Sequence, residues 1–263
     1  MTTTKKWADG PFELISSSRL GYKPGEKVKP VHTIAEEMII VHNLLLRGIN
    51  SIYLQCINVE RDPAVVPDFV SYAETWGKTV HEHHDAEETL VFPEMEELAG
   101  EPGLMEANVA QHKAFHDGVG TYQAYLADVG AGKEKYDGQR LKAIIDSFMP
   151  VLRQHLSDEI DSLMALEKYE EKTQWDKWFK GVMDKVLKKA DGAEMKFTSG
   201  PFAFQCHDKS FEDGRFAYWP PLPWFVMLLL RWFAVPKHKT WWQFSPCDTY
   251  GKRRELPYAD EKN

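Results

Sequence analysis

The chain has 263 residues, 43% of them hydrophobic, which is enough for one sizeable core with an appendage. Its formal net charge of −8 argues against the basic face that nucleic-acid-binding proteins present, so we expect no nucleic-acid partner. Three widely separated cysteines, Cys56, Cys206 and Cys247, form neither a disulfide framework nor a zinc motif and are typical of a reducing compartment. Because the opening residues also lack the apolar core of a signal peptide, we expect an intracellular, cytoplasmic protein.

The pattern of apolar and turn-forming residues divides the chain into an irregular N-terminal segment, a helical bundle and a C-terminal extension, at residues 1–30, 31–170 and 171–263. Four amphipathic helices are predicted in the bundle, at about 32–58, 67–99, from the break at 100–103 to 128, and 138–168. Pro93 should kink or end the second helix, and Pro150 should kink the fourth. The extension predicts a fifth helix near 174–190. We therefore predict an all-α protein.

Each bundle helix carries a stripe of residues, spaced alternately by four and three, that should face the core. The third stripe runs through Met105, Val109, His112, His116, Val119, Gln123 and Leu126. The middle of each stripe is occupied by potential metal ligands, which are His42, His83, Glu87, His112, His116, His155 and Glu159. Three pairs among these are four residues apart, so each pair points two side chains the same way, about 40° apart around the helix.

Buried carboxylates need a compensating charge, and the stripes contain no Lys or Arg to supply it. A metal centre supplies that charge, whereas a metal-free scaffold would require seven such residues to fall on the stripes by accident. Histidine and carboxylate ligands favour iron, zinc, manganese or copper over calcium and magnesium. Seven ligands are too many for one tetrahedral zinc ion, so the pattern predicts a centre with two ions.

The segment HEHHDAEE allows two pairings, His83 with Glu87 or His84 with Glu88. Only the first pairing continues the stripe of its helix. The other polar residues of this segment are then expected beside the stripe, as groups that support the ligands or face solvent; they are His81, His84 and Glu88. In the fourth helix, Asp158 and Asp161 lie outside the stripe and are expected to be surface charges.

The ordered motifs HDAEETLVFP, HKAFH and HLSDE, which follow a lone histidine on an earlier helix, resemble those of the hemerythrin-like, or HHE cation-binding, domain. The resemblance covers about residues 30–170. It implies an antiparallel four-helix bundle that holds two iron ions in a non-haem di-iron centre with an oxo or hydroxo bridge. It also implies that the seven residues above are the ligands, with Glu87 and Glu159 bridging. The oxygen-carrying members place Asp where this chain has Ile160, a departure that weakens the case for reversible oxygen carriage.

The C-terminal tail is rich in Trp, Phe and Pro, as in relatives from fungi with a similar extension. Its most apolar run, residues 222–235, is too short to span a membrane and contains Arg231. We favour a tail that wraps the bundle; a surface for self-association or a partner, and contact with a membrane interface, are the alternatives. His207 and His238 are expected to be ordinary polar residues, so that replacing His207 by Ala should change neither metal content nor stability.

Two functions are consistent with this sequence. The first is a di-iron protein that binds dioxygen for storage, sensing or iron and redox handling. The alternative is an oxidoreductase that activates dioxygen or peroxide to oxidise a small organic substrate of the secondary-metabolite type. Five imidazoles and two carboxylates favour binding, because bundle oxygenases usually have four carboxylates and two histidines. The aromatic tail favours the enzyme, since it could shape a substrate pocket. An apolar pocket that reaches the metals would distinguish the two.

Overall fold

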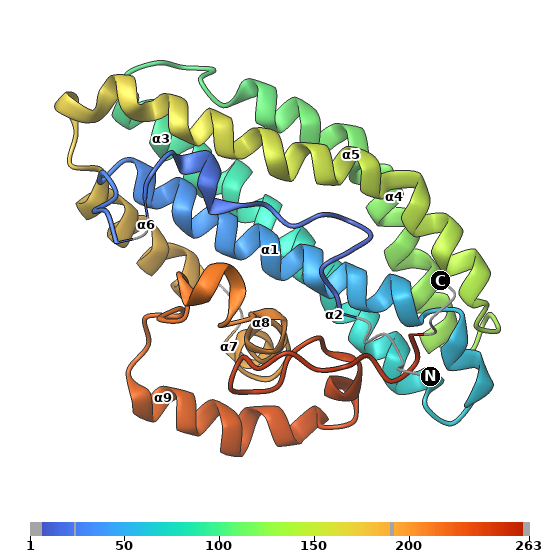
Figure 1. Cartoon of the computed structure of the whole chain (residues 1–263). Coiled ribbons are helices and arrows are strands. Elements are labelled where there is room, and N and C mark those ends of the chain that lie inside the picture. The colour runs from blue at the N-terminus through green and yellow to red at the C-terminus, as the bar shows by residue number, and fades with distance from the viewer. Residues whose placement is uncertain (1–6, 24, 190–191, 260–263) are drawn as a thin grey trace.

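The computed structural model describes residues 7–23, 25–189 and 192–259. Within these ranges the chain is helical, and an isolated β-bridge between Cys247 and Arg253 is the only strand-like pairing assigned. Four long helices run antiparallel to one another (Figure 1), and they are α1 (His32–Gln55), α2 (Val66–Ala86), α4 (Glu106–Gly130) and α5 (Gly138–Met164). Helix α2 packs between α1 and α4, and α4 packs between α2 and α5. Contacts between α1 and α5 close the bundle. The all-α prediction is confirmed.

The apolar stripes account for the core of the bundle. In α5, the side chains of Leu141, Ile145, Phe148 and Leu152 are all buried, in the order that the spacing predicts. The start of α5 is fixed by Asp137, whose side chain accepts a hydrogen bond of 2.9 Å from the backbone N–H of Arg140. Helix α5 continues through Pro150, which lies on the exposed outer face.

The second predicted helix is interrupted just after its metal-ligand candidates. One turn of π-helix, η3 (Glu87–Val91), follows α2, and the chain continues as α3 (Phe92–Ala99), with Pro93 in its first turn. Proline is tolerated there because the first N–H groups of a helix have no partner within the helix. Single π-turns are frequent at functional sites, since the extra residue changes which side chains face inward.

The N-terminal segment lies along α1 and is held there by two buried asparagines. Asn43 accepts from the backbone N–H of Ile15 at 2.8 Å and donates to its carbonyl at 2.9 Å. Asn50 bonds in the same way to Phe12 and donates to the carbonyl of Ala8. These bonds satisfy backbone groups of a segment in which one short 3-10 helix, η1 (Ser17–Leu20), is found among the described residues.

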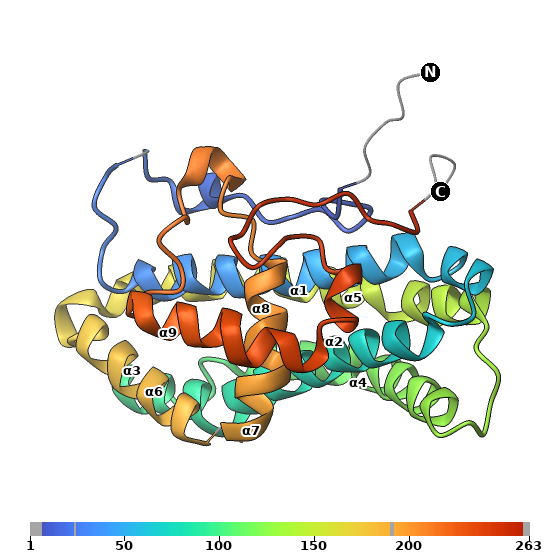
Figure 2. The ribbon, with the colours of Figure 1, turned by 90° about the horizontal axis from the view of Figure 1, so that it is seen from below.

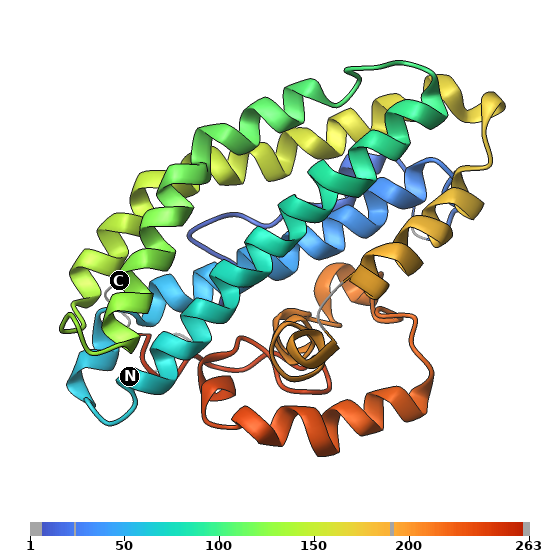
Figure 3. The same cartoon turned by 180° about the vertical axis from the view of Figure 1, so that it is seen from behind.

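The C-terminal extension covers the face formed by α1 and α2 (Figures 2 and 3). It comprises α6 (Trp175–Lys189), α7 (Gly192–Glu194), α8 (Gly200–Cys206) and α9 (Trp224–Leu229), with short π and 3-10 turns between them. Helix α8 approaches α1 closely at Gly48, where a Cβ atom would lie 2.5 Å from the ring of Phe202. No helix in the described part of the chain combines the length and apolar character that crossing a membrane requires.

Candidate metal centre

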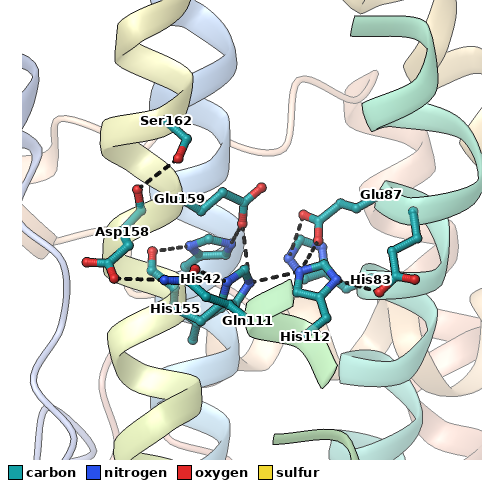
Figure 4. Close-up of polar contacts among 11 residues, drawn as sticks. His42, His83, Glu87, Gln111, His112, His155, Asp158, Glu159 and Ser162 are labelled. Atoms are coloured by element: carbon teal, nitrogen blue, oxygen red, sulfur yellow. Dashed lines mark hydrogen bonds and ion pairs between the residues drawn. The ribbon is translucent and has the colours of Figure 1, made fainter. Parts of the chain in front are cut away.

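The potential ligands of the bundle meet at its centre, where each of the four helices contributes at least one (Figure 4). Helix α1 contributes His42, α4 contributes His112, and α5 contributes His155 and Glu159. Helix α2 and the π-turn contribute His83, His84 and Glu87. All of these side chains are buried except that of His83, which is 12% exposed.

The donor atoms form two groups that share one carboxylate. His84, Glu87, His112 and His155 make the first group, and His42, His83, Glu87 and Glu159 make the second; within each group the donor atoms lie within 4.8 Å of one another. Glu87 Oε1 is 3.1 Å from His83 Nε2, and Oε2 is 3.6 Å from His112 Nε2. Glu159 Oε2 is 3.3 Å from His42 Nε2 and 3.6 Å from His155 Nε2. Each carboxylate therefore contacts histidines of both groups.

Most of these donor atoms are buried without a hydrogen-bond partner. This holds for the Nε2 atoms of His42, His83 and His84 and for both oxygens of Glu87 and Glu159. In the described part of the chain, the ion-pair partners of the two carboxylates are all histidines. Leaving so many buried polar atoms unpaired costs free energy, and a bound cation removes that cost. The residues present therefore fit a metal centre.

Hydrogen bonds at the far side of the imidazoles orient them toward the centre. His42 Nδ1 donates to the carbonyl of Leu156 at 2.7 Å, and His112 Nδ1 donates to Glu88 at 2.7 Å. A neutral imidazole with its proton on Nδ1 presents a lone pair on Nε2. Such partners hold the ring orientation and make the imidazole a better ligand.

His155 is held by a chain of two further side chains. Its Nδ1 donates to the amide oxygen of Gln111 at 3.1 Å, and the amide nitrogen of Gln111 donates to Asp158 at 3.0 Å. The Nε2 atoms of His155 and His112 then face one another at 3.1 Å. Because each imidazole carries its proton on Nδ1, the lone pairs of the two Nε2 atoms point at one another. A cation between them would stabilise this arrangement.

Burial sets the protonation of the centre. It lowers the pKa of His83 to about 3 and that of His155 to about 2, so both imidazoles are neutral at pH 7 and able to bind metal. Burial and the nearby Glu159 raise the pKa of Glu87 well above its usual range. Two carboxyls this close in an apolar site cannot both ionise easily without a cation.

The structure differs from the expected ligand set at two positions. The side chain of His116 is 76% exposed and lies beside Asp117, outside both groups. The inward stripe of α4 runs through Asn108, His112, Phe115, Val119, Tyr122 and Leu126, so Phe115 occupies the inward position instead. His84, which was expected beside the stripe, is buried and supplies the donor to the first group that His116 was expected to supply. The two donor groups together therefore contain five imidazoles and two carboxylates.

The spacing around Glu87 explains why both neighbouring histidines reach the centre. His83 precedes Glu87 by four residues and His84 precedes it by three, so they lie about 40° and 60° to either side of its direction. This i,i+3 relation was visible in the sequence. Two supporting residues were missed: Gln111, and Asp158, which was expected to be a surface charge.

Two hollows on the described surface lie outside the metal centre. The first, of about 370 Å³, is lined by residues of α3 and α6, and the second, of about 490 Å³, is lined by residues of the N-terminal segment and the tail. Neither is lined by a ligand candidate. Phe115 packs 5.0 Å from the ring of His84, and Phe92 stacks 5.8 Å from that of His112. These rings form apolar walls around the donors.

An antiparallel bundle with buried histidines and glutamates at its centre defines the class of four-helix metal-binding proteins. The family model described as the hemerythrin HHE cation binding domain matches residues 33–166. The chain belongs to this family.

The chain is also similar to a protein named "Dimeric xanthone biosynthesis cluster protein R11" from Cryptosporiopsis sp. (strain 8999). The two are 35% identical over 263 aligned positions, which cover 97% of this chain and 96% of the relative. No solved structure matches the chain.

Proposed function

We propose that the chain is a non-haem di-iron protein that binds dioxygen. Two ions would be held by the two donor groups, with Glu87, which belongs to both groups, and Glu159, which contacts a histidine of each, supplying the carboxylates. The observation that carries the proposal is the set of unpartnered donor atoms, buried at the centre of the bundle and drawn from all four helices. When bound, a pair of ferrous ions supplies the electrons that reversible reduction of dioxygen requires.

The residues around the centre suit a small diatomic ligand. Phe92 and Phe115 pack against the imidazoles and exclude water from the donors. Glu88 and Gln111 hold protons on the outer nitrogens of His112 and His155, away from the metal side. Because these aromatic rings pack against the imidazoles, and no donor residue lines either of the two hollows, the proposal favours dioxygen over a bulky organic substrate.

Anaerobic loading with ferrous iron tests this function. Iron should be counted per chain, and the visible spectrum recorded before air, in air and after vacuum. The proposal predicts two irons per chain and a visible band that appears in air and bleaches under vacuum. Two irons that pass irreversibly to the ferric state would contradict oxygen carriage.

A second function is favoured by the relative's name, which refers to a biosynthesis cluster. In this alternative the centre activates dioxygen or peroxide to oxidise a small organic compound, and a transient opening of the bundle admits that compound. An oxygen electrode distinguishes the two functions. Binding consumes one dioxygen per iron pair, whereas an oxidase given a phenolic xanthone and a reductant consumes many.

A further inference from the structure

One helix of the tail is apolar but not buried. Helix α9 and the π-turn η7 (Leu230–Ala234) form a continuous segment, and none of the six residues of α9 is buried. Trp224 is 74% exposed, Trp232 is 67% exposed and Phe233 is 62% exposed. The segment lies at the outer edge of the tail, away from the bundle (Figures 1 and 3). An exposed apolar patch of this kind marks an interaction surface.

The charge around this helix is opposite to that of the whole chain. Between Asp213 and Asp248 the sequence contains no acidic residue, although the chain has a net charge of −8. The bases on and after the helix are Arg231, Lys237 and Lys239, and both lysines are exposed. The segment from Trp224 to Lys239 is therefore apolar and cationic, and Asp68 of α2 lies at its end, where it accepts a hydrogen bond from Thr240.

The cationic character continues beside the helix. Arg231 lies over the ring of Tyr250 at 4.3 Å and donates to the carbonyl of Thr249 at 2.9 Å. Tyr250 in turn lines the hollow of about 490 Å³ together with Lys209 and Lys252. An anionic headgroup could occupy this hollow while the neighbouring helix contacts the acyl region.

We propose that α9 and η7 lie in the interface of an anionic membrane, parallel to its surface. Trp and Phe side chains would enter the boundary between headgroups and acyl chains, and the cations would contact the headgroups. A second copy of the chain fits less well, because a two-fold contact would place this cationic segment against the same cationic segment of the partner. The proposal does not depend on the metal centre.

Vesicle flotation of the full chain tests this surface. The probes are vesicles of phosphatidylcholine alone and vesicles that also contain phosphatidylserine at about a third of the lipid. The full chain should float with the anionic vesicles, less with the neutral ones, and less at high salt. The double variant Trp224→Ser/Trp232→Ser should lower partitioning by at least about tenfold, because it removes two large apolar side chains from the contact.

Charge reversal gives a second, independent variant. Lys237→Glu/Lys239→Glu should abolish the preference for anionic vesicles, whereas the matched variant Lys133→Glu/Lys135→Glu, in the loop between α4 and α5, should leave it unchanged. Circular dichroism confirms that each variant is folded. Absence of flotation, or equal flotation of the parent and the tryptophan variant, would overturn the proposal. The proposal would also be overturned if the parent formed a stable dimer, the tryptophan variant were monomeric, and neither protein bound vesicles.

Discussion

At the scale of single residues, Glu87, the first residue of the π-turn after α2, lies between two histidines of α2 and so belongs to both donor groups. His83 and His84 point to either side of it, and each belongs to a different group. A carboxylate in this position would supply negative charge to an ion in either group. The same position explains why His84 is a stronger ligand candidate than His116, whose side chain faces solvent.

Replacing His84 and His116 one at a time shows which of them is a metal ligand. His84→Ala removes one donor from the first group, so bound iron should fall from two ions per chain toward one, with affinity lowered by roughly tenfold or more. His116→Ala should retain two ions. Iron analysis after equilibrium dialysis measures both. The opposite pattern would show that the donor arrangement around His84 is wrong.

His207 shows how burial changes an expectation based on sequence position. It was expected to be an ordinary polar residue, but its side chain is buried and its Nε2 donates to the carbonyl of Phe216 at 3.0 Å. His207→Ala should therefore destabilise the protein, contrary to that expectation, because a buried carbonyl loses its donor.

The same residue predicts a dependence of stability on pH. Burial lowers the pKa of His207 from 6.5 to about 4. The unfolded chain therefore binds a proton below pH 6.5 that the folded chain does not bind until about pH 4, so stability falls as the pH falls through this window. The loss from this residue should approach about 3 kcal/mol at the acid end. Urea unfolding of the metal-free protein at several pH values measures it. His207→Gln, which keeps an N–H donor, should flatten the dependence, and an unchanged slope would contradict the assignment.

At the scale of elements, the sequence predicted the helices well because each one buries a stripe with a simple period. Helix α5, with its stripe from Leu141 to Leu152, is the clearest case. The prediction failed in α4, where the spacing of apolar residues alone does not decide which face of the helix turns toward the core. In α4, two stripes share His112, Val119 and Leu126 and differ by one residue at the positions between them. Only packing against α2 and α5 selects the stripe that contains Phe115.

The tail could not be predicted in this way, because it has no period and its contacts depend on surfaces formed elsewhere. Gln55, near the end of α1, donates to the carbonyl of Phe244 at 3.0 Å across 189 residues. Ser51 also donates to that carbonyl. Such contacts follow from the assembled bundle and leave no local pattern in the sequence.

The close approach of α8 to α1 gives a prediction at this scale. Gly48→Ala would place a Cβ atom 2.5 Å from Phe202 and 2.9 Å from Trp76, so it should destabilise the protein by about 1–3 kcal/mol. Gly120→Ala is the matched control. It lies within α4 with nothing inside 4 Å of the added atom, so it should be neutral or stabilising by up to about 1 kcal/mol. Chemical denaturation of both variants measures the difference, and equal stabilities would mean that α8 does not pack at Gly48.

At the scale of the whole molecule, the metal centre joins all four bundle helices. Without a cation, the core holds two carboxyls and several unpaired imidazole nitrogens. Ions that bind only the folded chain should therefore stabilise it, by about 2.7 kcal/mol at a free concentration one hundred times the dissociation constant. Thermal unfolding with and without a chelator measures this. A melting temperature that chelation leaves unchanged would contradict a centre that contributes to the fold.

The most direct test of the central claim is a crystal structure of the iron-loaded protein with anomalous data collected at the iron edge. The account predicts two anomalous peaks, one at each donor group, with His84 rather than His116 among the ligands and with Glu87 and Glu159 contacting both ions. A single peak, no peak, or an ion bound by His116 would contradict it.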